Sequence, residues 1–396
     1  MIVRLCVKVV TAVALALAGS SHTPADARPS DGALRTALQT DLNTYLKVHG
    51  VSEHVSAASL SVSLRGRSNN TMNLSAGTVQ YGGRTPVPSN SLWQIGSNTK
   101  AFTATTMLQL EAAHKLSIKD TVGKWLPQYP AWRDIMIERL LNMTSGIATY
   151  DERRAFRRAY AAAPTTDFSK ERLVSFAAGV PLQRGYNYTN TGYILAEMII
   201  EKATNDTYAH QLMKRFIKPL ALNDLFYRAN VYPRSVIARM PAGYFFVDTV
   251  KPFAKLLGTN VNDLGLSWTQ AAGGIVSSTD DLTKWTRALY GGRLLPPPQQ
   301  RELESLVSVK TGRPIARTSI EDPQGFALGV AQSTKSRLGT FWYYEGGTFG
   351  YRVLHLYLPR SGAIIAVALN SNAKSNAIGS GLALSVYKTL HDAGRI

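Results

Sequence analysis

Segments with strand-forming patterns lie at both ends of this 396-residue chain, and helical patterns fill the middle. Near the N-terminus, segments 58–64 and 71–80 are strand candidates, joined through the turn-forming residues 68–70. Helical periodicity dominates from about 99 to 226. The last third returns to short apolar and aromatic strand candidates, at 325–332, 340–345, 351–358 and 363–370. The simplest assembly is an α+β fold: one antiparallel sheet built from both chain ends, flanked by helices, with an all-helical domain inserted.

This pattern also predicts how the chain divides into domains. We assign residues 28–110 and 265–396 to an α/β domain and residues 111–264 to a mainly helical domain. Terminal helices are expected over 35–48 and 378–391. A ligand site is expected where the two lobes meet, because binding sites favour such boundaries.

Residues 1–27 have the pattern of a secretory signal peptide. Arg4 and Lys8 flank the start of an uncharged, mostly apolar stretch, and small-residue cleavage patterns end at Ala18 and Ala27. The stretch is too short to span a bilayer comfortably, and no later segment approaches 18 apolar residues. We therefore predict a secreted or periplasmic protein without a stable membrane span.

Composition excludes several classes of function. The only cysteine, Cys6, lies inside the predicted signal, so the mature chain has no disulfide, thiolate metal site or cysteine nucleophile. The seven histidines lack metal-ligand spacing, and no Gly-x-Ser-x-Gly motif accompanies them. The net charge is 44 − 26 = +18, yet the sequence contains no nucleic-acid module. The densest basic run is interpreted as a solvated helix face: Arg153, Arg154, Arg157 and Arg158.

A serine and a lysine three residues apart, Ser97 and Lys100, begin a long helix-compatible run. This spacing places both side chains on one face of a helix, about one turn apart. A lysine can deprotonate a serine hydroxyl only if burial or a neighbouring positive charge lowers the lysine pKa. If Ser97 begins the helix, its backbone N–H also points at any oxyanion formed there. The alternative is an N-cap serine with a surface lysine.

Two further serines in the chain have a lysine at the same spacing. Ser371-x-x-Lys374 follows the last strand candidate and is interpreted as a polar loop. Ser385-x-x-Lys388 lies inside the closing helix, without a helix N-terminus to support it. Neither pair is expected to be catalytic.

A second element, Tyr188-x-Asn190, occurs once among the 18 tyrosines. A phenol near a lysine ammonium can have its pKa depressed, which would make Tyr188 a general base or a proton shuttle. Asn190 could orient Lys100 or bind a substrate amide. The alternative is a turn before a helix over 191–204, with Asn190 as its N-cap.

A third element runs from Tyr344 to Gly350 on a predicted strand and turn. Gly346 and Gly347 would let the backbone of a substrate lie along the strand edge, and the Gly347 N–H could complete an oxyanion hole. The alternative is a glycine-rich hairpin turn.

These three elements, in this order, resemble those of the serine β-lactamase/penicillin-binding protein superfamily. The resemblance is strongest to class C β-lactamases, D-Ala-D-Ala carboxypeptidases, D-aminopeptidases and family VIII esterases. Segment 140–146 is similar to the family's Leu-Leu-x-His-Thr-Ser-Gly, with Met143 in the histidine position. The resemblance extends over about 33–390, with further matching phrases at 242–244, 271–274 and 326–330. It implies acylation of Ser97 by an ester, amide or lactam, hydrolysis by water, and no metal or organic cofactor.

The chain departs from the family pattern at Tyr344, where the family normally has Lys or His. That cation helps to bind a substrate carboxylate, whereas tyrosine supplies a hydroxyl and an aromatic wall. The departure favours ester or neutral amide substrates over β-lactams and D-Ala-D-Ala peptides. A literal Lys-Thr-Gly begins at Lys310 but precedes Pro314, which fits an interior strand poorly, so we interpret it as unrelated to the motif.

Two functions are consistent with the sequence. The first is an exported serine hydrolase, of esterase or D-Ala-D-Ala carboxypeptidase type, acting on a small-molecule or peptide substrate that includes cell-wall fragments. Ser97 would attack the carbonyl, and Lys100 and Tyr188 would move protons. Asn190 would orient Lys100, while the N–H groups of Ser97 and Gly347 hold the oxyanion. The second is a weakly active or non-catalytic module that binds cell-wall fragments, suggested by the missing cation in the third motif.

Overall fold

The computed structural model describes residues 30–65, 71–227, 230–373 and 378–396. The predicted signal peptide, with both cleavage points, and the predicted turn at 68–70 lie outside the described residues.

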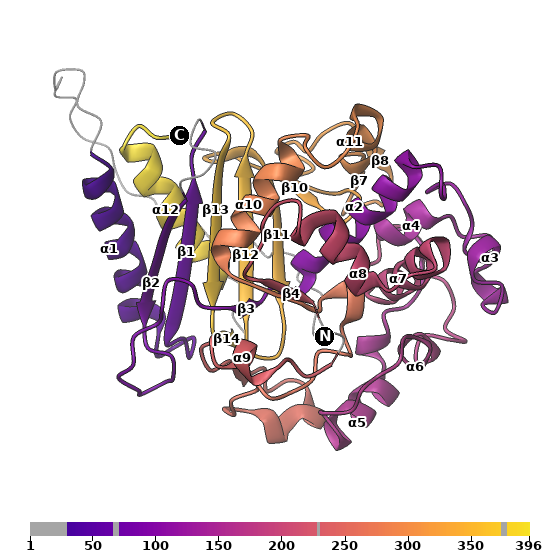
Figure 1. Cartoon of the computed structure of the whole chain (residues 1–396), viewed down its shortest axis with the longest axis horizontal. Coiled ribbons are helices and arrows are strands. Elements are labelled where there is room, and N and C mark those ends of the chain that lie inside the picture. The colour runs from indigo at the N-terminus through magenta and orange to yellow at the C-terminus, as the bar shows by residue number, and fades with distance from the viewer. Residues whose placement is uncertain (1–29, 66–70, 228–229, 374–377) are drawn as a thin grey trace.

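One antiparallel sheet of nine strands dominates the fold, in the order β2-β1-β13-β12-β11-β10-β9-β7-β8 (Figure 1). The first two strands come from the N-terminal part of the chain and the other seven from beyond residue 305, so the predicted α+β architecture is confirmed. The strands are β1 (Ala57–Ser63), β2 (Met72–Gly77), β7 (Leu306–Ser308), β8 (Pro314–Ile315), β9 (Gln324–Phe326), β10 (Ala331–Lys335), β11 (Gly339–Gly347), β12 (Arg352–Leu358) and β13 (Ala363–Leu369).

Helices cover both faces of the sheet. α1 (Asp31–His49) and α12 (Ile378–Asp392) pack together on one face, and α10 (Thr279–Tyr290) packs on the other. Every residue of β13 is therefore buried. Because side chains alternate along a strand, Ile365 and Val367 enter the core under α1 and α12, while Ala366 and Ala368 enter the core on the other side.

The middle of the chain forms short helices joined by long loops. The main helix is α2, which is buried over most of its length, and it packs against α7. These helices are α2 (Thr99–Ala112), α3 (Val122–Trp125), α4 (Ile137–Leu141), α5 (Arg154–Ala162), α6 (Lys170–Ser175), α7 (Thr191–Thr204), α8 (Tyr208–Leu212), α9 (Arg234–Ile237) and, later in the chain, α11 (Pro297–Leu303).

Short strands also occur outside the large sheet. β3 (Trp93–Gln94), β6 (Ile275–Ser277) and β4 (Leu225–Tyr227) form a three-stranded sheet next to the start of α2. β5 (Tyr244–Phe246) pairs in parallel with β14 (Ser371–Ala373). The domain boundaries at 110/111 and 264/265 stay a prediction.

Two local predictions need correction. Segment 325–332 is not one strand but two, β9 and β10, joined by a turn in which the Ala327 N–H donates to the Val330 carbonyl at 2.8 Å. Gly329 has φ +73°, and a Cβ there would lie 2.6 Å from the Lys100 carbonyl, so glycine lets this turn pack against α2. The helix expected to begin at 35 begins instead at Asp31, because Ser30 Oγ caps it by accepting from the Ala33 N–H at 3.2 Å.

In the part of the chain that the structure describes, no helix combines the length and apolar character needed to cross a membrane.

Candidate active site

The nucleophile candidate lies in a turn that leads into α2. Residues Gly96–Asn98 form a 3-10 turn, and α2 follows from Thr99. Ser97 is 4% exposed and Lys100 is completely buried, and Lys100 Nζ lies 3.1 Å from Ser97 Oγ. The alternative of a surface lysine is therefore wrong, because this lysine faces inward toward the serine.

Lys100 is held by three oxygen atoms. Besides Ser97 Oγ, Nζ contacts Asn190 Oδ1 at 2.7 Å and the Ala272 carbonyl at 2.7 Å. Burial lowers the pKa of Lys100 to about 7, although the nearby Asp151 carboxylate acts in the opposite direction. A neutral amine keeps two N–H groups for Asn190 and Ala272, and its lone pair is then free to accept the hydroxyl proton of Ser97.

Tyr188 approaches the same serine from the other side. Its hydroxyl donates to Ser97 Oγ at 2.8 Å and receives a longer contact from the Tyr344 hydroxyl at 3.4 Å. Asn190 precedes α7, but its side chain does not cap that helix and binds Lys100 instead. Folding thus brings Ser97, Lys100, Tyr188 and Asn190 into one hydrogen-bonded cluster.

The predicted depression of the Tyr188 pKa is wrong. Burial raises this pKa well above its ordinary value, and the hydrogen bonds with Ser97 and Tyr344 oppose the shift only in part. The distance from Lys100 Nζ to the ring centroid of Tyr188 is 5.0 Å. Tyr188 is therefore a neutral donor at ordinary pH, and Lys100 is the better base.

The third motif lies at the end of β11. Tyr344 is buried, and its ring packs edge-on against Phe326. A Cβ added to Gly346 would lie 1.9 Å from the Ile95 carbonyl and 2.8 Å from the Ser97 nitrogen. Gly346 is therefore needed for the approach of the nucleophile turn, and its expected role along a substrate backbone stays a prediction.

Gly347 has more free space around its Cα atom than Gly346 has. A Cβ at this position would have its nearest neighbour at 3.9 Å, the Tyr351 carbonyl. Gly96 has φ +52°, and a Cβ there would lie 2.8 Å from the Gly347 nitrogen. The nucleophile turn and the strand end thus pack backbone against backbone.

Residues 270–272 contribute a contact that the sequence analysis did not predict. The turn Gln270–Ala272 presents the Ala272 carbonyl to Lys100. The Ala271 N–H donates to Glu197 Oε2 at 2.9 Å, and Thr103 Oγ1 donates to the Ala271 carbonyl at 2.8 Å. The family-like phrase at 271–274 is the sequence signal that indicates this role.

A second unpredicted network fixes the turn around Ser97. Asn98 Nδ2 donates to the carbonyls of Ile95 at 2.7 Å and Val353 at 3.0 Å. Asn98 Oδ1 must then accept from His355 Nδ1, 2.7 Å away. Burial lowers the pKa of His355 to about 3, so the ring stays neutral and holds β12 to the nucleophile turn.

The remaining residues noted in the sequence lie outside the hydrogen-bonded cluster around Ser97. Met143 has φ +64°, and its sulfur accepts from the Thr189 N–H at 3.3 Å, next to Tyr188. Lys310 is exposed in the turn between β7 and β8, and Tyr344 rather than Lys310 reaches the cluster. Ser385 lies on α12, whereas Ser371 is in strand β14, which corrects its interpretation as a loop.

Within the described ranges, no group of three or more His, Cys, Asp or Glu side chains is arranged to hold a metal ion.

Comparison with known proteins gives consistent results. Residues 47–388 match the protein family described as Beta-lactamase. The chain is 26% identical over 295 residues to penicillin-binding protein 4* of Bacillus subtilis (strain 168), and this match covers 71% of this chain and 61% of that protein. It is 25% identical over 133 residues to the teichoic acid D-alanine hydrolase of Staphylococcus aureus, covering 34% of this chain and 32% of that protein. The chain thus spans less than two thirds of the length of either relative.

A solved structure shows the same fold. The D-stereospecific amidohydrolase from Streptomyces sp. has a TM-score of 0.73 and 27% identity, over 89% of this chain and 97% of that chain. Since the family match alone covers most of the sequence, the chain belongs to the Beta-lactamase family, has the β-lactamase fold and is related to penicillin-binding proteins.

Proposed function

We propose that this protein is an exported serine hydrolase that cleaves an ester or amide through an acyl-enzyme on Ser97. One observation carries the proposal: Ser97 Oγ lies 3.1 Å from Lys100 Nζ and 2.8 Å from the Tyr188 hydroxyl. A serine between a lysine whose pKa is near 7 and a neutral phenol has both a base and an acid within reach.

In the acylation step, Ser97 Oγ attacks the substrate carbonyl while its proton passes to the neutral amine of Lys100. The N–H groups of Ser97 and Gly347 hold the negative oxygen of the tetrahedral intermediate. When the intermediate collapses, the leaving group takes a proton from the Tyr188 hydroxyl, which regains one from the Lys100 ammonium. Lys100 is then neutral again.

In the deacylation step, water takes the place of the leaving group. Lys100 removes a proton from that water as its oxygen attacks the acyl carbon, and the proton finally returns to Ser97 Oγ. Asn190 and the Ala272 carbonyl keep the amine in place in both steps, because they bind it independently of the serine.

The substrate we propose is a D-aminoacyl ester or amide. Tyr344 offers no positive charge for a carboxylate next to the scissile bond, which disfavours D-Ala-D-Ala peptides and β-lactams. The related Streptomyces amidohydrolase is described as D-stereospecific, and the Staphylococcus relative as a hydrolase of D-alanine on teichoic acid. Both descriptions are compatible with an acyl group that lacks a neighbouring carboxylate.

A hydrolysis screen tests the proposal. We expect the protein to cleave a p-nitrophenyl ester and D-alanine esters or amides faster than a D-Ala-D-Ala peptide or nitrocefin. A fluorophosphonate should label Ser97, and Ser97→Ala should lose both labelling and turnover. A protein that takes no label and cleaves none of these substrates would support the alternative of a non-catalytic cell-wall-fragment binding module.

A further inference from the structure

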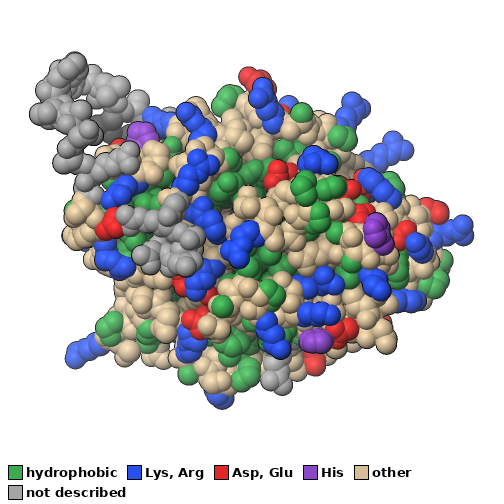
Figure 2. Space-filling model, turned by 45° about the horizontal axis from the view of Figure 1, so that its top comes forward, with side chains coloured by type: hydrophobic (Ala, Val, Ile, Leu, Met, Phe, Trp, Pro, Cys, Tyr) green, Lys and Arg blue, Asp and Glu red, His purple; other side chains and the backbone are tan. Residues whose placement is uncertain are grey.

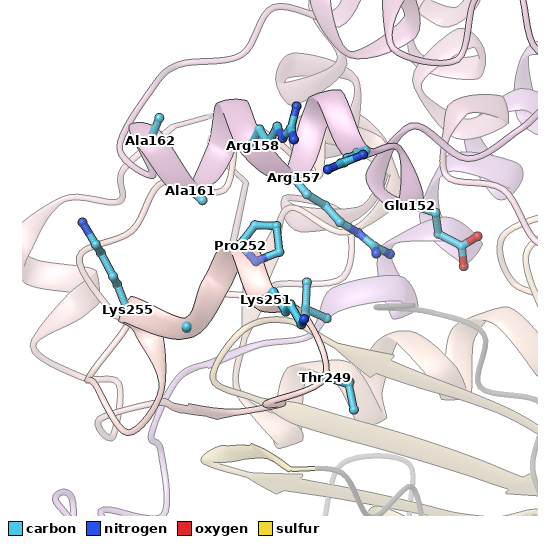
Figure 3. A pocket seen from close by; sticks show the side chains of 12 residues that line it. Glu152, Arg157, Arg158, Ala161, Ala162, Thr249, Lys251, Pro252 and Lys255 are labelled. Atoms are coloured by element: carbon cyan, nitrogen blue, oxygen red, sulfur yellow. The ribbon is translucent and has the colours of Figure 1, made fainter.

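A separate hollow of about 930 Å³ lies between α5 and segment 249–255, which overlaps the 3-10 helix Lys251–Leu256. Figure 3 shows α5 as one wall and segment 249–255 as the opposite wall, with the side chains of Arg157, Lys251 and Pro252 between them. No residue of the Ser97 cluster lines this hollow.

The lining of the hollow is strongly basic. Five cationic side chains contribute, against a single acidic one, Glu152; the cations are Arg154, Arg157, Arg158, Lys251 and Lys255. None of the five forms an ion pair with a carboxylate in the described part of the chain. Cations from α5 thus converge with cations located about 95 residues further along the chain, and like charges placed together raise the free energy of the unliganded surface.

Arg157 is the most informative member of the group. Its Nε donates to the Asp151 carbonyl at 3.1 Å, which fixes the guanidinium, but Nη2 is buried without any hydrogen-bond partner. Burial also lowers the pKa of Arg157, because the charge is desolvated without a counterion. A buried, unpaired charged group is costly, and the negative charge of an anion in the hollow would stabilise this guanidinium through space without contacting Nη2.

The arrangement fits phosphate better than a single carboxylate. Guanidinium groups bind phosphate oxygens in a bidentate manner, and lysines supply further charge. The hollow is far larger than one phosphate group, and its cations line two facing walls. The net charge of +18 would attract an extended polyanion, and Lys and Arg side chains clearly outnumber Asp and Glu on the face of the molecule drawn in Figure 2.

We propose that this hollow binds a phosphate group of a polyol-phosphate chain. The side chains of Arg153, Arg154 and Arg158 are exposed, as predicted for a solvated helix face, and in this proposal Arg154 and Arg158 also contribute to binding. This basic run follows directly after a segment that contacts the candidate active site. Thr149 Oγ1 accepts from the Asn190 N–H at 3.0 Å, and the carbonyl of Asp151, two residues after Thr149, accepts from Arg157 Nε. If the chain carries acyl esters, the hollow recruits the substrate of Ser97; this extension rests on the proposed function.

Binding of poly(glycerol phosphate), measured by isothermal titration calorimetry at about 0.15 M salt, tests the proposal. The triple variant Arg158→Gln, Lys251→Gln, Lys255→Gln should bind the polymer at least about tenfold more weakly, because three charge-assisted contacts are lost. A matched triple variant at exposed cations away from the hollow, Lys47→Gln, Arg84→Gln and Lys115→Gln, has the same net charge and should stay within about twofold of the unaltered protein.

Several results would overturn the proposal. Equal losses in both triple variants would mean that overall charge, not the hollow, attracts the polymer. If free inorganic phosphate binds as tightly as the polymer, or duplex DNA binds more tightly, the assignment to a polyol-phosphate chain fails. Arg157→Gln, checked for folding by thermal unfolding, should weaken binding on its own because the charge is lost, and unchanged binding would contradict the role assigned to the Arg157 charge.

Failure of the binding site and failure of the proposed hydrolase are distinguishable. Ser97→Ala should keep its affinity for the polymer while losing turnover of a p-nitrophenyl ester. The triple variant Arg158→Gln, Lys251→Gln, Lys255→Gln should lose affinity for the polymer and keep its turnover of the p-nitrophenyl ester. A protein that hydrolyses the small ester but does not bind the polymer would end the binding proposal alone.

Discussion

At the scale of single residues, burial determines the chemistry of the candidate site. The same low-dielectric surroundings lower the pKa of Lys100 and raise that of Tyr188, because each shift favours the neutral form. With both groups neutral, the amine is the base and the phenol is the acid on either side of Ser97. Hydrogen bonds to Asn190 and Ala272 position the amine.

The pKa of Lys100 predicts how activity depends on pH. The amine acts as a base only when it is neutral, so kcat/KM should fall about tenfold per pH unit below about 7 and reach a plateau above it. Lys100→Ala should lower kcat by about 100-fold or more. The pH–rate profile for a p-nitrophenyl ester checks this, and a flat profile between pH 5.5 and 8.5 would contradict the assignment of Lys100 as the base.

Tyr344 predicts substrate preference. Tyr344→Lys, assayed near pH 6, places a cation beside Tyr188, because even the fully buried Lys100 keeps a pKa of about 7. The ratio of kcat/KM for a carboxylate-bearing ester to that for a neutral ester should rise about tenfold, as expected for one charge-assisted hydrogen bond. Tyr344→Phe is the matched control without a charge. An unchanged ratio in the lysine variant would mean that this position does not select carboxylates.

At the scale of elements, the site depends on how closely the nucleophile turn approaches β11. That turn is fixed to β12 by Asn98 and His355, and it contacts β11 where Gly346 leaves room. The β9–β10 turn at Gly329 approaches the carbonyl of Lys100 in the same manner. Small residues at these contacts let backbone pack against backbone, which places the serine between lysine and tyrosine.

Two neighbouring glycines give a matched test of this packing. Gly346→Ala puts a methyl group against the Ile95 carbonyl and should destabilise the protein by about 3 kcal/mol, with loss of activity. Gly347→Ala has no close neighbour and should change the free energy of unfolding by less than about 1 kcal/mol. Urea unfolding of both variants measures the difference. Equal stabilities would show that the turn and the strand are not tightly packed.

At the scale of the whole molecule, the antiparallel sheet joins strands from both ends of the chain, and helices pack on both of its faces. The contact between α11 and α2 includes a pair of carboxyl groups, Glu302 and Glu111. Burial first, and then the hydrogen bond with Glu111, raises the pKa of Glu302 to about 7. Folding therefore favours the protonated form of Glu302.

This pair predicts a pH dependence of stability. Because the folded-state pKa of Glu302 exceeds its ordinary value of 4.5, its contribution to stability is full below about pH 4.5 and is lost as the pH rises through about 7. Glu302→Gln keeps a hydrogen-bond donor without titrating, so it should flatten that part of the profile. The Tm measured between pH 5 and 8 checks this, and parallel curves for both proteins would contradict it.

Local spacing in the sequence was enough to identify much of the site. A separation of three residues places Ser97 and Lys100 on one helical face whatever the rest of the chain does, and alternation reveals strands at both chain ends. The sequence therefore predicted the α+β sheet and the candidate residues Tyr188 and Asn190. It could not predict that the segment at 325–332 turns back on itself, because Gly329 is needed there only by its contact with α2.

The protonation states, the contacts around Lys100 and the basic hollow were decided by tertiary structure alone. Desolvation depends on which atoms surround a group, and these come from distant segments: Asn190 and Ala272 lie 90 and 172 residues from Lys100 along the chain. The direction of the Tyr188 pKa shift followed from burial that no local pattern reveals. Likewise, the arginines of α5 line a basic hollow only because Lys251 and Lys255 fold against them.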